Sequence, residues 1–182
     1  MKPGKIVKKY KLGNQEIIFR YPKMSDIKDL LELINNLVKE KVYIGSQQKK
    51  TLKEEKHWLE NTLTEIKNRE KVHLVVEVNG KIMGNTDIKK SRMAAEQHTG
   101  TFGIMIRREI RGTGISERLF KAIEKEAKKV LKIKIIKLTA FTANKRASAF
   151  YKKQGFRTVG RIKNGLKYYG RYADEIIMVK YL

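Results

Sequence analysis

Apolar residues that recur at intervals of three and four positions predict four α-helices in this chain. The first helix begins at Ser25 or Asp26, since either side chain can cap it. One continuous apolar face follows, made of Ile27, Leu30, Leu31, Ile34, Leu37 and Val38. Leu33 lies off this stripe, and we predict that it packs against the segment that follows.

The other three helices show the same periodicity. The second begins at the capping box of residues 51–54 and runs to about Arg69, with these residues inward: Leu52, Leu59, Leu63 and Ile66. The third has an apolar stripe made of Ile115, Leu119, Ile123, Ala127 and Val130. The fourth is capped by Asn144 and carries Ala147, Phe150, Tyr151 and Gln154. Gly155 fits the left-handed conformation that often ends a helix.

Shorter apolar runs predict seven strands, over residues 16–21, 72–78, 81–88, 98–106, 133–141, 156–162 and 172–179. Asn79-Gly80 tolerates the positive φ angles of a two-residue turn, so residues 72–88 are expected to form a hairpin. Residues 98–106 are expected to lie antiparallel to its second arm. Residues 1–11 are a basic lead-in that is either frayed or an added edge strand. Polar loops are expected over residues 41–50, 89–97 and 164–171.

Length and composition indicate one folded domain of mixed α/β class. The chain has 182 residues, of which 41% are hydrophobic, and no linker or repeat divides it. We therefore expect a basic segment at residues 1–15 and one domain at residues 16–182. No apolar run approaches the roughly 20 residues of a membrane helix, and no apolar signal core follows the N-terminus, so we expect a cytoplasmic protein. The absence of cysteine excludes a cysteine nucleophile, a thiolate metal site and disulfides.

The formal net charge of +23 favours encounter with anionic ligands, including nucleic acids. Association with RNA or the ribosome is one interpretation. Lysine and glutamate enrichment is also a feature of hyperthermophile surfaces. Because the lysines are scattered along the whole chain, the charge pattern leaves both interpretations open.

A strand at residues 102–106 leads into a glycine turn that opens directly into the third helix. The first amides of a helix lack partners, and glycines at positions 112 and 114 let an anion approach the backbone closely. Nearby arginines at positions 107, 108 and 111 add positive charge. This pattern predicts a phosphate site, although a helix start that merely contains glycine is the alternative. It is not a Walker loop, and Glu117 stands where a dinucleotide fingerprint needs its third glycine.

Two motifs resemble those of the GNAT acetyltransferase superfamily. The family's pyrophosphate loop, Arg/Gln-x-x-Gly-x-Gly/Ala, is matched by Arg111 and Gly114, whereas Ser116 departs from its last position. The second pattern, Asn-x-x-Ala followed by Tyr-x-x-x-Gly-Phe, is matched by Asn144, Ala147, Tyr151, Gly155 and Phe156. The order of predicted elements is also similar to that of the GNAT fold, over nearly the whole chain.

The resemblance implies a GNAT fold, with a mostly antiparallel sheet of six or seven strands flanked by four helices. It implies a V-shaped splay between the fourth and fifth strands, in which acetyl-CoA would sit. Ile104, Met105 and Ile106 would pair with the pantetheine arm. The pyrophosphate would be held by Arg111, Gly112, Thr113, Gly114, Ile115 and Ser116. Asn144 and Tyr151 would also contact the cofactor, although helix capping is an equally good role for Asn144.

The implied activity is N-acetyl transfer from acetyl-CoA to a primary amine, by direct attack in a ternary complex. Tyr151 would be the general acid that protonates the CoA thiolate, and a core aromatic is its structural alternative. The usual strand glutamate is replaced by Thr101, which cannot act as a base. His98 has the best intrinsic pKa for this role. The other candidates are water, Glu77, Asp87 and the Asp174-Glu175 pair.

The sequence does not identify the acceptor, which is a small amine, a protein N-terminus or a lysine. Residues 41–50, 89–97 and 164–171 would shape its pocket. The basic field argues for acidic, neutral or RNA-associated acceptors. The main alternative function is a non-catalytic acyl-CoA- or RNA-binding module on the same fold. We expect no membrane partner, and no metal site because the three histidines lack ligand spacing. Formation of a homodimer is left open.

Overall fold

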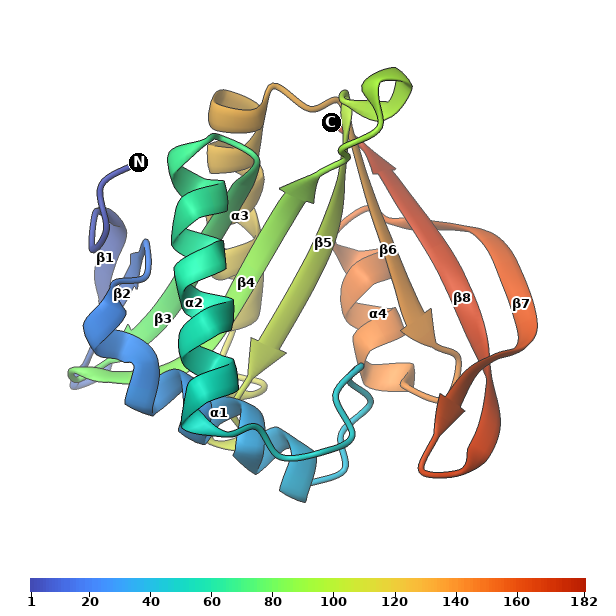
Figure 1. Cartoon of the computed structure of the whole chain (residues 1–182), viewed down its shortest axis with the longest axis horizontal. Coiled ribbons are helices and arrows are strands. Elements are labelled where there is room, and N and C mark those ends of the chain that lie inside the picture. The colour runs from blue at the N-terminus through green and yellow to red at the C-terminus, as the bar shows by residue number, and fades with distance from the viewer.

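The computed structural model describes residues 1–182, which form one eight-stranded sheet with helices on both faces (Figure 1). The strands are β1 (Ile6–Leu12), β2 (Gln15–Arg20), β3 (Lys71–Val78), β4 (Lys81–Lys90), β5 (Thr99–Ile106), β6 (Ile135–Phe141), β7 (Arg157–Tyr168) and β8 (Arg171–Tyr181). Their order across the sheet is β1-β2-β3-β4-β5-β6-β8-β7. The α-helices are α1 (Ile27–Lys39), α2 (Leu52–Lys67), α3 (Ile115–Leu131) and α4 (Lys145–Lys153). Three short 3₁₀ turns are η1 (Met24–Asp26), η2 (Ala94–Glu96) and η3 (Arg108–Ile110).

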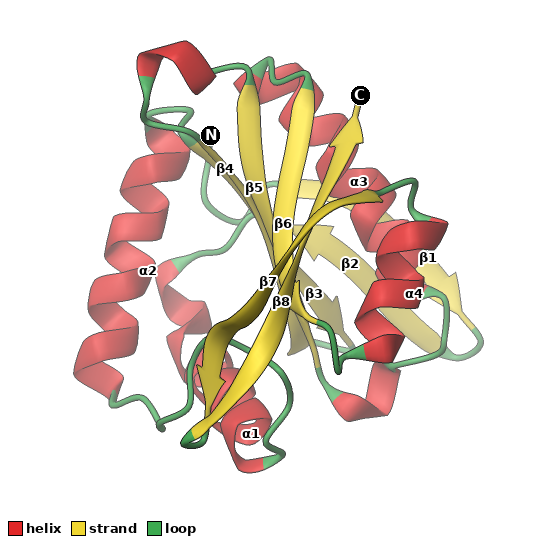
Figure 2. Cartoon of the chain, turned by 90° about the vertical axis from the view of Figure 1, so that its right-hand side faces the viewer, coloured by secondary structure: helices red, strands yellow, loops and turns green.

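The helices form two layers around the sheet. Figure 2 shows α1 and α2 on one side of the sheet and α3 and α4 on the other. Strand β3 lies between α2 and α3, which explains why even Lys71 and His73 on this strand are buried. None of the four α-helices combines the length and the apolar character needed to cross a bilayer.

Two apolar clusters hold these layers together. The larger has 23 buried residues and lies mainly between the sheet and α3, where Leu119, Ile123 and Ala127 occupy the predicted stripe. The smaller lies between the sheet, α1 and α2 and contains Leu30, Leu33, Leu37, Leu59, Val75 and Ile82. Between β5 and β6 the sheet opens into a gap.

That gap is the predicted splay of the sheet. β5 and β6 run parallel and pair at only three positions, where residues 99–101 face residues 135–137. Beyond Thr101 the two strands diverge, as Figure 1 shows, so the end of β5 keeps only β4 as a neighbour. The V-shaped opening between the fourth and fifth predicted strands is therefore confirmed. The sheet has eight strands instead of six or seven, because part of the basic lead-in forms β1 and pairs with β2.

The locally encoded turns and caps agree with the sequence. Thr51 and Glu54 form a reciprocal capping box at the start of α2. Asn79 and Gly80 have φ angles of 48° and 82°, as the hairpin between β3 and β4 requires. Gly155 has a φ of 90° and follows the C-cap of α4.

Several side-chain predictions were wrong where tertiary contacts decide. Leu33 is fully buried and belongs to the inward stripe of α1 together with Leu30 and Leu37, so its assignment off that stripe was wrong. Leu52 at the first position of α2 is 54% exposed. Asp26 does not cap α1 through its side chain. Its carboxylate instead accepts two hydrogen bonds of 2.8 Å from Arg20.

The predicted loop at residues 164–171 is also wrong, since β7 and β8 extend through most of it. Leu166, Lys167 and Tyr168 pair with Ala173, Tyr172 and Arg171. Only Tyr169 and Gly170 remain between the strands, with φ angles of 46° and 82°. The result is a long hairpin whose tip reaches the α1–α2 connection.

Candidate active site

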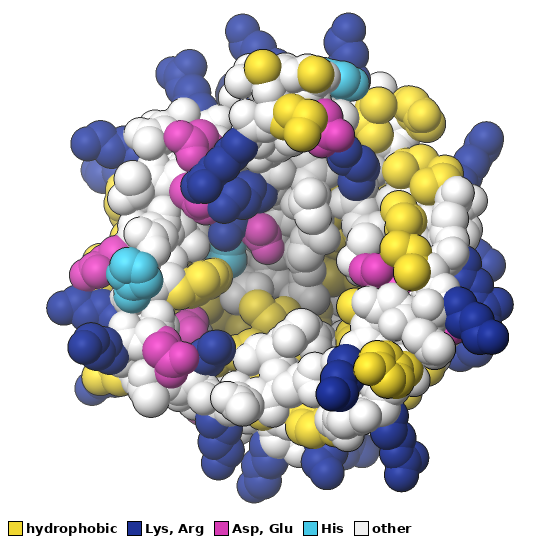
Figure 3. Space-filling view, turned by 45° about the vertical axis from the view of Figure 1, so that its right-hand side comes forward, with side chains coloured by type: hydrophobic (Ala, Val, Ile, Leu, Met, Phe, Trp, Pro, Cys, Tyr) yellow, Lys and Arg dark blue, Asp and Glu magenta, His cyan; other side chains and the backbone are white.

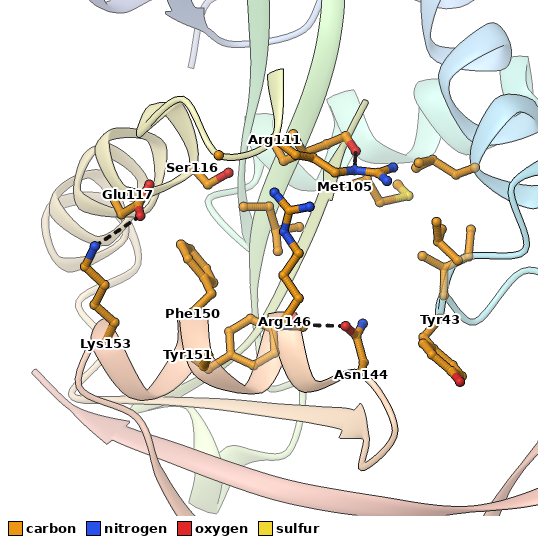
Figure 4. A pocket seen from close by; sticks show the side chains of 18 residues that line it. Tyr43, Met105, Arg111, Ser116, Glu117, Asn144, Arg146, Phe150, Tyr151 and Lys153 are labelled. Atoms are coloured by element: carbon orange, nitrogen blue, oxygen red, sulfur yellow. Dashed lines mark hydrogen bonds and ion pairs between the residues drawn. The ribbon is translucent and has the colours of Figure 1, made fainter. Parts of the chain in front are cut away.

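A cavity of about 420 Å³ opens where β5 and β6 separate (Figure 4). The end of β5, the glycine turn, the starts of α3 and α4, and the α1–α2 connection all contribute to its wall. The lining is mostly apolar and includes Val42, Tyr43, Ile44, Ile104, Met105, Ile106, Gly112, Ser116, Glu117, Asn144, Ala147, Phe150 and Tyr151. Two arginines, Arg111 and Arg146, supply positive charge at the same cavity. The structure thus brings the two predicted motifs together.

The floor of the cavity is the unpaired end of β5. Ile104, Met105 and Ile106 line it, and on their other side they pair with β4. The backbone edge that faces the splay has no strand beside it after Thr101. An extended ligand chain with amide groups could hydrogen-bond to this edge as an added strand does.

The glycine turn leaves the start of α3 without a side-chain cap. Gly112 and Gly114 have φ angles of 83° and 80°, and Gly114 is the N-cap of α3. A Cβ on Gly114 would meet nothing within 4 Å, so the space in front of the helix is open. Uncapped amides and the helix dipole together favour an anion at this position.

Arg111 links the glycine turn to two neighbouring elements. Its Nε donates a 2.9 Å hydrogen bond to the carbonyl oxygen of Ile106, and its Nη2 donates a 2.8 Å hydrogen bond to Glu40. The guanidinium therefore ties the turn to β5 and α1. The hydroxyl of Thr113 bonds the carbonyl oxygen of Ile110 in the same turn, 2.8 Å away.

Arg146 is a site residue that the sequence analysis missed. It extends from the first turn of α4 across the cavity toward the glycine turn, as Figure 4 shows. Its Nη2 lies 3.7 Å from the position that a Cβ on Gly112 would occupy. The only sequence signal was its place as a variable position inside the Asn144–Ala147 motif, where the pattern assigns no role.

Asn144 caps α4 and also lines the cavity. Its Oδ1 accepts a 3.2 Å hydrogen bond from the backbone N–H of Ala147, so the capping prediction is confirmed. Its side-chain N–H₂ group is not used by that bond and lies at the cavity. The cap orients the Asn144 side chain before any ligand arrives.

Tyr151 projects from α4 into an aromatic group beside the cavity. Its ring lies edge-on to Phe102 and Phe150, with centroids 6.2 Å and 5.6 Å away. Burial raises the pKa of its hydroxyl to about 12. The phenol therefore keeps its proton through the physiological range, as a proton donor must.

The base candidates are scattered. His98 is exposed in the turn before β5, and roughly 20 Å of strand separate it from Ile104 at about 3.3 Å per residue. The structure does not bring it to the cavity. Glu77 bonds Arg20 at 2.7 Å, and Asp174 is ion-paired with Arg161. Thr101 lies on β5 in a second hollow, which it shares with Asp87.

This second hollow lies on the same face of the sheet as α2. It is lined by Asp87, Lys89, Lys90, Arg92, Thr101, Phe102 and Gly103. Figure 3 shows the molecule hollowed on this face, with lysines and arginines around the rim and acidic side chains closer to the centre. No group of three or more His, Cys, Asp or Glu residues is placed to hold a metal ion.

The α1–α2 connection forms one wall of the first cavity through Val42, Tyr43 and Ile44. It also contacts the tip of the β7–β8 hairpin. The side chain of Gln47 donates to the carbonyl oxygen of Lys167 and accepts from the N–H of Tyr169, both at 2.6 Å. The hydroxyl of Tyr168 donates to the carbonyl oxygen of Lys41. Tyr43 packs against both Tyr168 and Phe141, with ring centroids 5.0 Å and 5.2 Å away. Two predicted acceptor segments are thereby joined.

Comparison with solved structures finds the same fold in several acetyltransferases. A ribosomal-protein-alanine N-acetyltransferase from Brucella melitensis superposes with a TM-score of 0.81 and 24% identity, over 90% of this chain and 99% of that chain. The putative acetyltransferase YncA from Salmonella typhimurium, solved with acetyl-CoA, gives 0.80 and 17%, over 91% and 94%. A phosphinothricin acetyltransferase from Sinorhizobium meliloti, solved with AcCoA, gives 0.79 and 18%, over 91% and 88%.

Sequence comparison gives the family directly. Among curated proteins none matches the chain. The family model described as the acetyltransferase (GNAT) domain matches residues 19–177, which include both motifs and the whole cavity wall. The chain belongs to the GNAT acetyltransferase family.

Proposed function

We propose that the protein transfers an acetyl group from acetyl-CoA to a primary amine by direct attack in a ternary complex. The observation that carries this proposal is the shared cavity, where the uncapped start of α3, the free edge of β5 and the Tyr151 hydroxyl meet. Two of the similar structures described above were solved with acetyl-CoA. Their likeness supports the same donor here.

The residues around the cavity fit an acyl-CoA donor. The amides of residues 112–116 would hold the pyrophosphate, and Arg146 over Gly112 adds a formal charge beside them. Ile104 and Ile106 would offer backbone groups to the pantetheine arm. Asn144 has a free amide N–H₂ at the same wall. Bound acetyl-CoA would supply the activated acyl group.

Tyr151 would donate its proton to the sulfur that leaves the acyl group. Because its raised pKa of about 12 keeps this phenol protonated at neutral pH, its proton is available to the sulfur as the C–S bond breaks. A backbone N–H near Met105 would stabilise the oxyanion that develops during attack. Apolar walls around both groups limit competing hydrolysis by water.

The acceptor in our proposal is a primary amine, and the similar structures indicate which kinds of amine this fold can take. One similar structure is a ribosomal-protein-alanine acetyltransferase and another is a phosphinothricin acetyltransferase, so the fold serves different amines. The hydrogen-bonded contact between the α1–α2 connection and the tip of the β7–β8 hairpin, which we call the clamp, narrows the path by which an acceptor can reach the cavity. We infer that the acceptor carries its amine at the end of a narrow group. A protein N-terminus and a small amine both meet this requirement.

Thiol release from acetyl-CoA across a panel of amines, peptides and ribosomal proteins tests the proposal. We expect turnover with at least one acceptor and none without it. Thr101, which replaces a carboxylate of the family pattern, is the observation that favours the alternative of a non-catalytic acyl-CoA-binding module. Calorimetric binding of CoA without turnover on any acceptor would establish that alternative. Absence of CoA binding would overturn both.

A further inference from the structure

Three residues on neighbouring strands lie in one row across the sheet. His73 on β3 pairs with Asp87 on β4, and Asp87 pairs with Gly103 on β5. Directly paired residues point to the same face of a sheet. The row therefore faces α2 and the second hollow, and it ends two residues before Met105 at the cavity floor.

Gly103 provides the space that the Asp87 carboxylate occupies. A Cβ at position 103 would lie 2.9 Å from Asp87 Oδ1, closer than real Cβ contacts allow. The φ angle of Gly103 is not in the positive region, so the backbone does not require glycine there. The missing side chain instead lets the carboxylate lie directly against β5.

The Asp87 side chain is enclosed but still reaches solvent, with 29% of its surface exposed. Its Oδ2 lies 3.6 Å from Nζ of the buried Lys71. Desolvation raises the pKa of Asp87, and Lys71 partly opposes this shift. A carboxylate with a raised pKa takes up a proton more readily than an exposed one.

The charged groups around Asp87 come from three directions. Lys71 and His73 face it from β3, Lys89 lies beside it on β4, and Glu65 faces it from α2. Glu65 Oε1 accepts a 2.5 Å hydrogen bond from Nζ of Lys89, so this ammonium group is paired with Glu65. Arg92 at the rim also bonds Glu65, at 3.2 Å. Burial holds the pKa of His73 well below its ordinary value, so this ring is neutral and does not compete for the proton.

We propose that Asp87 is the general base of the transfer and replaces the carboxylate that Thr101 lacks. This inference rests on the proposed acetyltransferase function. The Asp87 carboxylate takes one proton from the acceptor ammonium, directly or through one water. The nitrogen lone pair then forms a C–N bond with the thioester carbon, and the carbonyl π pair moves to oxygen.

The remaining protons and electrons balance within the site. When the oxyanion reforms the carbonyl, the C–S bond breaks and its electron pair goes to sulfur. Tyr151 protonates that sulfur, and the resulting phenolate takes the second proton from nitrogen. The products are the amide, the free thiol and one proton, which Asp87 passes to solvent. No other reactant is needed.

Asp87→Asn removes the base and keeps the size of the side chain. We expect kcat/KM for an alkylamine at pH 7 to fall by about 100-fold, the lower limit for loss of a general base. CoA affinity, measured by calorimetry, should stay within about twofold, because Asp87 lies outside the donor cavity. Glu60→Gln is the matched control, since it removes one exposed carboxylate from α2 without touching either hollow.

Acceptor basicity separates a base from a residue that only shapes the site. A weakly basic amine that is already neutral at pH 7, such as a hydrazide, needs no initial deprotonation. With the hydrazide, kcat/KM of Asp87→Asn should therefore lie within a few-fold of the wild-type value. With the alkylamine, its rate should instead rise about tenfold per pH unit as free amine accumulates. Equal loss with both acceptors would overturn the proposal.

Gly103→Ala provides a second test that keeps Asp87 itself. The new Cβ would displace the carboxylate from β5, and we expect a loss of at least about tenfold that is again confined to protonated amines. Gly160→Ala on β7 is its control, because a Cβ there meets Ile177 at an ordinary 3.6 Å. If the wild type turns over amines and Asp87→Asn does so at the same rate, the role of Asp87 is refuted while the proposed function stands. Absence of wild-type turnover with every amine would refute the proposed function, and the inference with it.

Discussion

Nε of Arg111 donates a 2.9 Å hydrogen bond to the carbonyl oxygen of Ile106, which joins the glycine turn to the last residue of β5. The same guanidinium reaches Glu40 just after α1. One side chain thus fixes the distance between the strand edge and the start of α3. These are the two elements that we propose hold the pantetheine arm and the pyrophosphate of the donor.

Arg111→Met should loosen this connection. Loss of a hydrogen bond to a charged donor costs about 1.5 kcal/mol or more, and we expect CoA affinity to fall by about tenfold together with a lower melting temperature. Isothermal calorimetry and thermal melts measure the two effects. Arg108→Met removes the same charge from an exposed neighbour and should change neither by a comparable amount. Equal behaviour of the two variants would reduce the role of Arg111 to net charge.

Gly114→Asp should weaken donor binding. The substitution places a negative charge at the uncapped start of α3 and strains a backbone with φ of 80°. We expect the Kd for CoA to rise by about tenfold or more. Gly13→Asp matches the strain and the charge, since Gly13 has φ of 57° and open space around it, but lies far from the cavity. If calorimetry gives the two variants the same Kd, the anion site at α3 is wrong.

Tyr151→Phe should lower turnover while donor binding persists. Removal of a general acid costs about 100-fold or more in kcat, whereas the ring and its contacts with Phe102 remain. Because burial raises the Tyr151 pKa to about 12, no fall in rate due to this hydroxyl is expected below about pH 10. Steady-state kinetics with Tyr172→Phe, an exposed control, would show the contrast. Unchanged kcat in Tyr151→Phe would remove Tyr151 from the chemistry.

Gln47→Ala should release the α1–α2 connection from the β7–β8 hairpin. The side chain makes two hydrogen bonds across this contact, each worth about 1 kcal/mol. We expect faster amide hydrogen exchange over residues 41–50 and an acceptor KM several-fold higher. Gln48→Ala is the control, because the Gln48 side chain is exposed and makes no such bond. Identical exchange in both variants would contradict the clamp.

His73→Leu should make the protein more resistant to acid. His73 is fully buried, and desolvation, followed by the charge of Lys71, lowers its folded-state pKa well below 6.5. As the pH falls below 6.5 the unfolded chain gains a proton that the folded chain refuses, so the free energy of unfolding decreases by up to about 1.4 kcal/mol per pH unit. The stabilising effect of the neutral ring is thus present above pH 6.5 and lost below it.

Urea unfolding between pH 5 and 7 measures this slope. Wild type should lose stability more steeply toward pH 5 than His73→Leu does. His98→Leu, at an exposed position, should follow wild type. Parallel curves for wild type and His73→Leu would show that His73 does not cause the pH dependence.

The sequence alone determined the features that depend on a few neighbouring residues. Three such features are the Asn79-Gly80 turn, the Thr51–Glu54 capping box and the Asn144 cap. Each depends on hydrogen bonds or φ angles within four consecutive residues, so the identities of those residues are sufficient to predict it. The glycine turn before α3 is encoded in the same way. Two such motifs at a characteristic separation identified the family.

Only the tertiary structure decided which distant residues meet. The sequence pattern favoured His98 as the base because of its intrinsic pKa, but β5 carries that residue away from the cavity. The strand register instead places Asp87 against Gly103, and the packing of α4 places Arg146 over Gly112. Likewise, the length of the β7–β8 hairpin brings Tyr168 to the α1–α2 connection. Register, strand length and helix position are set by burial summed over the whole core, and no local pattern of residues contains that sum.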